Sequence, residues 1–191
     1  SRLAKLLMKI VIAEPFHPAG IEGLTAQLDW ESVVSNPQEY EQHLPDADAL
    51  LAARSVRVTA AQIEKGKNLK VIAFPGVGTD FVDFDAATSA GVLVMNMPGV
   101  SAVSVAEHTL GLMLAMARQI PQAIESTRRG TWDAKRFLGT ELRRKTLGVM
   151  GLGSIGREVV RRARAFEMRI IANDPYVNSE TATDLGVALV S

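Results

Sequence analysis

The chain has 191 residues, of which 47% are hydrophobic and 22% charged, a composition typical of a globular protein that buries a core and one that excludes a disordered chain. Lysine plus arginine equals aspartate plus glutamate at 21 each, which excludes a strong overall attraction to nucleic acid or to an anionic membrane and favours a small-molecule partner. The sequence has no cysteine, which excludes disulfides and thiolate chemistry and is typical of a reducing compartment such as the cytoplasm.

The first eight residues, SRLAKLLM, are basic and apolar, but their apolar stretch is too short for a signal peptide and is followed by no small-residue cleavage site. We interpret them as a vector-derived or upstream remnant that precedes Met8.

Five short apolar runs rich in β-formers follow, with helix-like segments between them, at residues 9–14, 30–34, 49–53, 70–74 and 92–95. Runs that are apolar on both faces and alternate with helices predict buried, parallel strands with helices on both sides of the sheet. We therefore expect an α/β protein that begins with a five-stranded, flavodoxin-like parallel sheet.

The longest apolar stretch, residues 103–120, contains Glu107, His108, Thr109 and Arg118. These polar residues argue against the roughly 20 apolar residues of a membrane span, and we predict a buried helix that links two domains.

A charged, irregular arm with Trp132 comes next, at residues 122–145. Strands at 147–150, 169–173 and 187–190, with a helix at 155–166, then predict the first half of a Rossmann domain.

A glycine loop lies between the first of these strands and the helix. Gly151, Gly153 and Gly156 have the spacing of a dinucleotide-binding turn, and the strand before and the helix after them are the context that this motif requires. The three glycines allow a tight turn, a close approach of the backbone to a pyrophosphate, and close packing of helix on strand. The alternative is that they only shape a strand-to-helix turn.

Asp174 ends the next strand, near the roughly 20-residue offset expected for the carboxylate that binds the adenosine ribose hydroxyls. Such a carboxylate repels a 2′-phosphate, and the following Pro175 and Tyr176 offer no cation, so the pattern favours NAD over NADP. The alternative is that Asp174 merely ends a strand.

Further ordered motifs carry a family resemblance: GVGTDFVD at 76–83, SVAEHT at 104–109, the arm GTW to FLGTEL at 130–142, and KTLG at 145–148. Together with the glycine loop they resemble the D-isomer-specific 2-hydroxyacid dehydrogenase family, and the segment from Ala117 through the arm is most similar to its phosphoglycerate dehydrogenases. The resemblance implies a hinged enzyme with a substrate-binding domain at 8–100 and an incomplete nucleotide-binding domain at 101–191.

The resemblance also implies site residues. Arg54, Ser55, Val77 and Gly78 would face the carboxylate or phosphate of the substrate, and an arginine fork suits an oxyanion; for Arg54 the alternative is a solvated loop cation. The position of Val77, together with Ser154, Ile155 and Asp174, would contact NAD. Three departures from the family pattern leave substrate identity open: Ser154 stands at a frequent arginine, Phe81 at an asparagine, and the segment 98–101 lacks an asparagine.

The catalytic arginine, glutamate and histidine of the family are expected beyond residue 191, so we assign no catalytic residue here and expect this chain alone to be inactive. Glu107 and His108 do not form a dyad, because adjacent helical residues point about 100° apart; we expect His108 to be an interdomain or core residue. Nor does any spacing suggest a metal site.

The function implied for the full-length protein is NAD-dependent oxidation of a D-2-hydroxyacid, with 3-phosphoglycerate, a substrate of serine biosynthesis, as the first candidate. The partners would be a 2-hydroxyacid or 2-oxoacid, without nucleic acid or membrane, and a second copy of the chain bound through the nucleotide-binding domain and the arm at 128–142. The alternative is a non-catalytic NAD-sensing or corepressor protein on the same fold.

Overall fold

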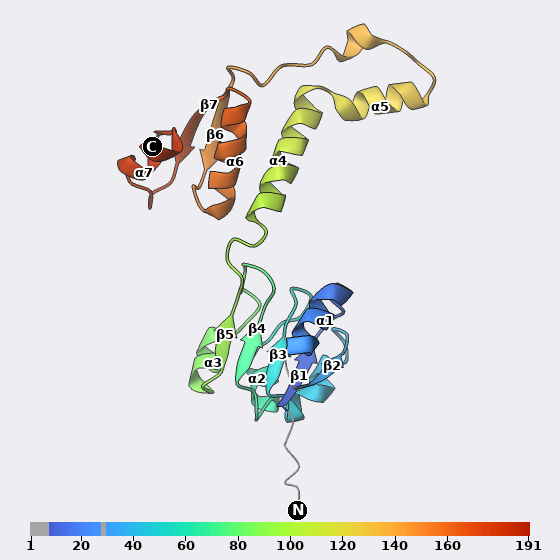
Figure 1. Cartoon of the computed structure of the whole chain (residues 1–191), viewed down its shortest axis with the longest axis vertical. Coiled ribbons are helices and arrows are strands. Elements are labelled where there is room, and N and C mark those ends of the chain that lie inside the picture. Colours follow the sequence, from blue (N-terminus) through green and yellow to red (C-terminus); the bar gives the residue numbers. More distant parts are fainter. Residues whose placement is uncertain (1–7, 28–29) are drawn as a thin grey trace, which may run out of the picture. The chain divides into compact units, whose positions relative to one another are not determined.

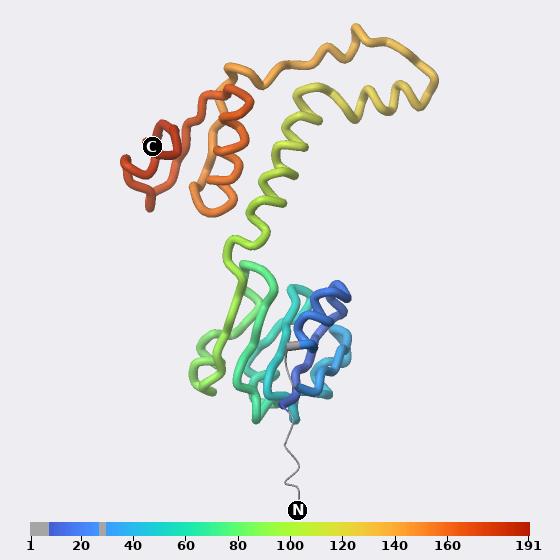
Figure 2. Tube along the Cα trace, viewed as in Figure 1, coloured from blue at the N-terminus to red at the C-terminus, as the bar shows by residue number. Residues whose placement is uncertain are grey.

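The computed structural model describes residues 8–27 and 30–191, so the remnant predicted before Met8 lies outside the described residues. The chain divides into two compact units, Ser1–Pro98 and Gly99–Ser191, each built from parallel strands and helices (Figure 1). The path of the backbone through each unit can be followed in Figure 2.

The first unit contains one sheet of five parallel strands in the order β2-β1-β3-β4-β5. The strands are β1 (Met8–Ile12), β2 (Trp30–Val34), β3 (Ala49–Leu51), β4 (Val71–Ala73) and β5 (Leu93–Met95). This is the doubly wound order of flavodoxin-like folds, in which ligands bind at the carboxyl ends of the strands. The predicted fold of this part is confirmed.

Successive side chains in the sheet enter two different layers, as the twofold alternation of a strand requires. Val11, Leu50 and Ile72 belong to the larger core, beneath the helical elements η1 (Tyr40–Asp46), α2 (Ala60–Lys65) and α3 (Phe84–Ser89). The alternate residues Ile10 and Ile12 pack with side chains of α1 (Pro18–Gln27).

The prediction that all five strands are buried on both faces is wrong for two of them. β2 and β5 form the edges of the sheet, and their burial is incomplete. Leu93 and Met95 are 59% and 51% exposed. Sequence alone does not reveal which of several apolar runs lies at an edge, because that depends on strand order.

The second unit contains a parallel sheet of three strands in the order β6-β7-β8: β6 (Thr146–Met150), β7 (Arg169–Asn173) and β8 (Ala188–Leu189). Val160 and Ala163 of α6 (Ser154–Ala165) pack with Ile170 and Ala172 of the central strand, and α7 (Ser179–Leu185) connects β7 to β8. Consecutive parallel strands joined by helices are the first half of a Rossmann fold, as predicted.

The helix α4 (Ala102–Ala117) packs along α6 in the same unit (Figure 1), with Ala106 and Leu110 buried against Val159. It is not the fully buried helix that its apolar sequence predicts, because Leu112 and Met116 are 52% and 79% exposed.

The arm that follows α4 contains α5 (Ile120–Arg128) and the short 3-10 helix η2 (Ala134–Phe137). Among the described residues, no helix combines the length and apolar character needed to cross a membrane.

Candidate functional site

The glycine loop joins β6 to α6, as the motif requires. Gly151 has φ +90°, a left-handed conformation that favours glycine. A Cβ at Gly156 would overlap the carbonyl oxygen of Gly151 and lie 3.1 Å from its carbonyl carbon, so the chain's own packing needs glycine there. Both residues are therefore fixed by the tight strand-to-helix turn.

Gly153 is different. A Cβ at this position would meet no protein atom within 4 Å, and its backbone, with φ −67° and ψ −168°, lies in a region open to any residue. The space on the Cβ side of Gly153 contains no protein atom within 4 Å, and the first N–H groups of α6 have no acceptor within the helix. The loop thus has the form that a pyrophosphate needs, with open room above a glycine and backbone donors beside it.

The peptide groups around Leu152 are held by two side chains. The Leu152 N–H donates to Asp174 Oδ2 at 2.6 Å, and Arg157 Nε donates to the Leu152 carbonyl oxygen at 2.8 Å. The Leu152 side chain is 1% exposed and belongs to the core. Arg157 was not among the predicted site residues, although its place directly after the third glycine was an available signal.

Asp174 follows β7 and faces the glycine loop. Its second oxygen, Oδ1, accepts the Tyr176 N–H at 2.9 Å. The Leu152 N–H, then the Tyr176 N–H, hold the pKa of the Asp174 carboxyl below its usual value, and the charge of Arg157 acts in the same direction. An ionised carboxylate has about four acceptor sites, so both oxygens remain able to accept ribose hydroxyls.

Five of the predicted cofactor residues line one hollow together with Thr109 and Met113 of α4: Gly151, Gly153, Ser154, Ile155 and Gly156. Asp174 does not line this hollow and contacts the loop through the Leu152 N–H. The structure therefore gathers the predicted glycine-loop residues at one hollow and ties the predicted carboxylate to the same loop by a hydrogen bond.

In the first unit, the predicted substrate residues lie after the carboxyl ends of neighbouring strands. Arg54 and Ser55 follow β3, and Val77 and Gly78 follow β4. A Cβ at Gly78 would lie 3.4 Å from Arg54 Nη1, so the guanidinium lies beside the Gly78 backbone. Arg54 and Ser55 are exposed and Val77 is 44% exposed, which leaves this edge accessible to a ligand.

Two polar residues at this edge were missed by sequence reasoning. Ser55 Oγ donates its hydroxyl proton to the carboxylate of Glu14, which follows β1. Asn96, which follows β5, donates from Nδ2 to the Val77 carbonyl oxygen at 2.7 Å. Each is a polar residue just after an apolar strand, but its partner lies on another strand and could not be inferred from spacing.

Backbone hydrogen bonds complete the support of the loop at 75–80. Met97 N–H donates to the Gly76 carbonyl oxygen at 2.7 Å, and Phe74 N–H donates to the Met95 carbonyl oxygen at 2.8 Å. A Cβ at Gly76 would lie 2.5 Å from the ring of Phe74, so glycine is needed where this ring packs under the loop. The loop is therefore held by a hydrogen bond from Met97, which follows β5, and by packing on the ring of Phe74.

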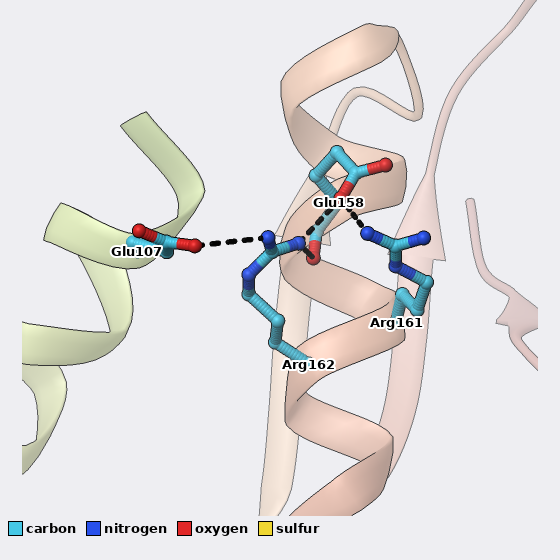
Figure 3. Close-up of polar contacts among 4 residues, drawn as sticks. All are labelled: Glu107, Glu158, Arg161 and Arg162. Atoms are coloured by element: carbon cyan, nitrogen blue, oxygen red, sulfur yellow. Dashed lines mark hydrogen bonds and ion pairs between the residues drawn. The ribbon is translucent and has the colours of Figure 1, made fainter. Parts of the chain in front are cut away.

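Glu107 and His108 do not act as a pair. Glu107 Oε1 accepts from Arg162 Nη2 at 3.3 Å, and Arg162 and Arg161 also donate to Glu158 (Figure 3). Arg161 and Arg162 of α6 are thus paired with carboxylates. His108 is exposed within its unit, so the core alternative is wrong, and the interdomain alternative stays a prediction.

The sequence matches the family described as D-isomer specific 2-hydroxyacid dehydrogenase, catalytic domain, over residues 10–189. Because this match covers nearly the whole chain, the chain belongs to that family. The predicted family resemblance is confirmed.

Individual relatives agree. The chain is 48% identical to D-3-phosphoglycerate dehydrogenase of Methanocaldococcus jannaschii over 185 residues, covering 96% of this chain and 35% of that protein. Among solved structures, a protein from Thermus thermophilus has a TM-score of 0.86 at 30% identity, and the match covers 96% of this chain and 60% of that protein's chain. NAD-dependent formate dehydrogenase from Staphylococcus aureus, in complex with NAD, has a TM-score of 0.78 at 27% identity, with 96% and 60% covered. The chain therefore spans about a third of the curated relative's length.

Proposed function

We propose that this chain supplies the substrate-anchoring and NAD-binding parts of a D-2-hydroxyacid dehydrogenase, with D-3-phosphoglycerate as the first candidate substrate. The observation that carries the proposal is the glycine loop: open space above Gly153, N–H donors at the start of α6, and an ionised Asp174 bound to the same loop. Of the two compact units, Gly99–Ser191 would be the nucleotide-binding part and Ser1–Pro98 the substrate-binding part.

NAD would be held by two kinds of contact. The N–H groups of Gly153, Ser154 and Ile155 face the pyrophosphate, where the helix dipole also favours negative charge. Asp174 accepts the adenosine ribose hydroxyls and repels a 2′-phosphate, which disfavours NADP. When bound, NAD supplies the acceptor for the hydride that leaves the substrate.

The substrate would be anchored by Arg54 and by the backbone at Val77 and Gly78. A guanidinium can bind a carboxylate or phosphate with two parallel hydrogen bonds, which sets its orientation as well as its affinity. Because the Ser55 proton is donated to Glu14, we assign the donors for the anion to Arg54 and the backbone, and not to the Ser55 hydroxyl. We propose that the acid-base histidine and its partners lie in the part of the relatives' length that this chain does not span.

A homodimer is the proposed assembly. Trp132 and Leu138 in the arm are 86% and 75% exposed, and Ile124 of α5 is 47% exposed. Large exposed apolar side chains, tryptophan above all, are typical interface anchors. We expect the full-length protein to sediment as a dimer at micromolar concentration and Trp132→Ala to shift it toward monomer; a monomeric wild type would contradict the proposal.

The proposed activity is tested with the full-length protein by following NADH absorbance with D-3-phosphoglycerate, D-lactate and other D-2-hydroxyacids. We expect turnover that is highest with D-3-phosphoglycerate, and none from the 191-residue chain alone. NAD binding without turnover on any 2-hydroxyacid would contradict the enzyme and favour the NAD-sensing alternative. Comparable turnover by the short chain would show that its own residues carry the catalysis.

A further inference from the structure

Arg157 and Arg164 of α6 both donate to main-chain carbonyl oxygens, Arg157 to the glycine loop and Arg164 to Leu185. Arg161 and Arg162 donate to the carboxylate of Glu158 on their own helix (Figure 3). Arg157 instead reaches back from the first turn of the helix, and its Nε donates to the carbonyl oxygen of Leu152 at 2.8 Å. An arginine that binds a loop carbonyl rather than a nearby acid is acting on backbone geometry.

The carbonyl that Arg157 binds belongs to a planar peptide group shared with Gly153. In a trans peptide, the N–H of the next residue points opposite to the carbonyl oxygen. A contact that draws the Leu152 carbonyl toward Arg157 therefore directs the Gly153 N–H the other way. The preceding peptide is fixed separately, because the Leu152 N–H donates to Asp174 Oδ2 at 2.6 Å.

Among the described residues, no second side chain hydrogen-bonds to the Leu152–Gly153 peptide group. The buried Leu152 side chain, 1% exposed, anchors the Cα but leaves the next peptide free to rotate about its backbone torsions. The backbone at Gly153 lies in a broadly allowed region, and a Cβ there would touch no protein atom within 4 Å. The Gly153 carbonyl oxygen accepts the main-chain N–H of Arg157 at 3.0 Å, whereas the Gly153 N–H belongs to the preceding peptide group and depends for its direction on the contact at the Leu152 carbonyl.

We propose that Arg157 is a positioning residue that orients the Gly153 N–H toward the pyrophosphate of the cofactor. Arg157 acts through the Leu152 carbonyl and not as a counter-charge to the phosphates. The inference rests on the proposed NAD binding and adds to it a second side-chain support of the glycine loop beside that of Asp174.

Two substitutions in the full-length protein separate position from charge. In Arg157→Gln, the side-chain amide nitrogen occupies the same place along the side chain as Arg Nε, so a donor remains while the charge is lost. In Arg157→Met, length remains and both donor and charge are lost. We expect NAD to bind Arg157→Met about fivefold more weakly, the effect of one lost hydrogen bond, and Arg157→Gln to stay within about twofold of the wild type.

The matched control is Arg161→Met, one turn further along the same helix, where the side chain pairs with Glu158 and not with the loop. Its NAD affinity should equal that of the wild type. Equal weakening of Arg157→Gln and Arg157→Met would show that charge matters and would overturn the inference. So would wild-type affinity in Arg157→Met.

Hydrogen exchange across residues 151–156 separates this inference from the proposed function. Arg157→Met should accelerate exchange in that segment of the cofactor-free protein and Arg157→Gln should not, whether or not NAD binds. Absence of NAD binding by the wild type would sink the proposed function alone, whereas unchanged exchange in Arg157→Met would overturn the positioning role.

Discussion

The two loops proposed to bind anions are held by different kinds of contact. The glycine loop of the second unit is shaped mainly by local backbone requirements, at Gly151 with its positive φ and at Gly156 against the Gly151 carbonyl. The loop at 75–80 in the first unit depends on residues from other strands, chiefly Asn96 on the Val77 carbonyl and Arg54 beside Gly78. The local requirements at Gly151 and Gly156 could be predicted from the sequence, whereas the contact of Asn96 with the Val77 carbonyl could not.

The largest effect is expected where the local requirement is strictest. In Gly156→Ala the new Cβ would overlap the Gly151 carbonyl, so helix and strand must separate. We expect the second unit to lose about 1–3 kcal/mol of unfolding free energy, typical of overpacking, and NAD binding to be lost with it. Urea unfolding and calorimetry measure both.

The control for Gly156→Ala is Gly111→Ala on an exposed part of α4, where a Cβ would meet nothing within 4 Å. It should leave stability unchanged or raise it by up to about 1 kcal/mol. Equal behaviour of the two variants would show that close helix–strand packing does not shape the glycine loop.

Gly153→Ala tests whether a ligand, and not packing, requires the second glycine. The methyl group meets no protein atom within 4 Å, so thermal stability should not fall. It enters the space proposed for the pyrophosphate, and we expect NAD affinity to fall about 10- to 100-fold through lost charge-assisted hydrogen bonds. Unchanged NAD affinity in Gly153→Ala, measured by calorimetry, would show that the pyrophosphate does not bind beside Gly153.

In the first unit, Arg54→Gln removes the proposed anion-binding fork. We expect KM for the hydroxyacid to rise about 10- to 100-fold, the range for a lost hydrogen bond to a charged group, while NAD affinity stays constant. Arg57→Gln is the control, since this exposed arginine lies on the same loop and contributes its main-chain carbonyl to the Tyr40 hydroxyl. A rise in KM of similar size in both variants would indicate a general loss of charge rather than a specific site.

A smaller effect is expected for Asn96→Asp, which keeps the shape of the side chain but replaces the donor to the Val77 carbonyl with an acceptor. The loop should be held less firmly, and we expect KM to rise about 5- to 10-fold, the effect of one lost hydrogen bond, with kcat little changed. Asn36→Asp is the control because Asn36 also donates from Nδ2, to Glu39, elsewhere in this unit. If kcat fell while KM held, Asn96 would not act through substrate anchoring.

Much of the fold followed from the sequence, because apolar runs and glycine punctuation are local signals. Strand β7 and the five-stranded parallel sheet were predicted correctly, and the spacing of Gly151, Gly153 and Gly156 predicted the turn from β6 to α6. Burial was less predictable: Leu93 and Met116 are apolar yet exposed, because strand order and helix packing decide which face is covered. Glu14 and Asn96 were not predicted because each contacts a residue on a different strand, which spacing does not reveal. Arg157 was not predicted because its side chain acts on a main-chain carbonyl, although it directly follows the third glycine.

The central claim is that Asp174 and the glycine loop form an NAD site, and titration calorimetry of the full-length protein with NAD and NADP tests it most directly. The account predicts that the wild type binds NAD at least about tenfold more tightly than NADP, which corresponds to about 1.4 kcal/mol. It also predicts that Asp174→Ala weakens NAD and removes most of this preference, because the carboxylate that accepts ribose hydroxyls and repels a 2′-phosphate is gone. Unchanged NAD affinity in Asp174→Ala, or equal wild-type affinity for the two cofactors, would contradict the account.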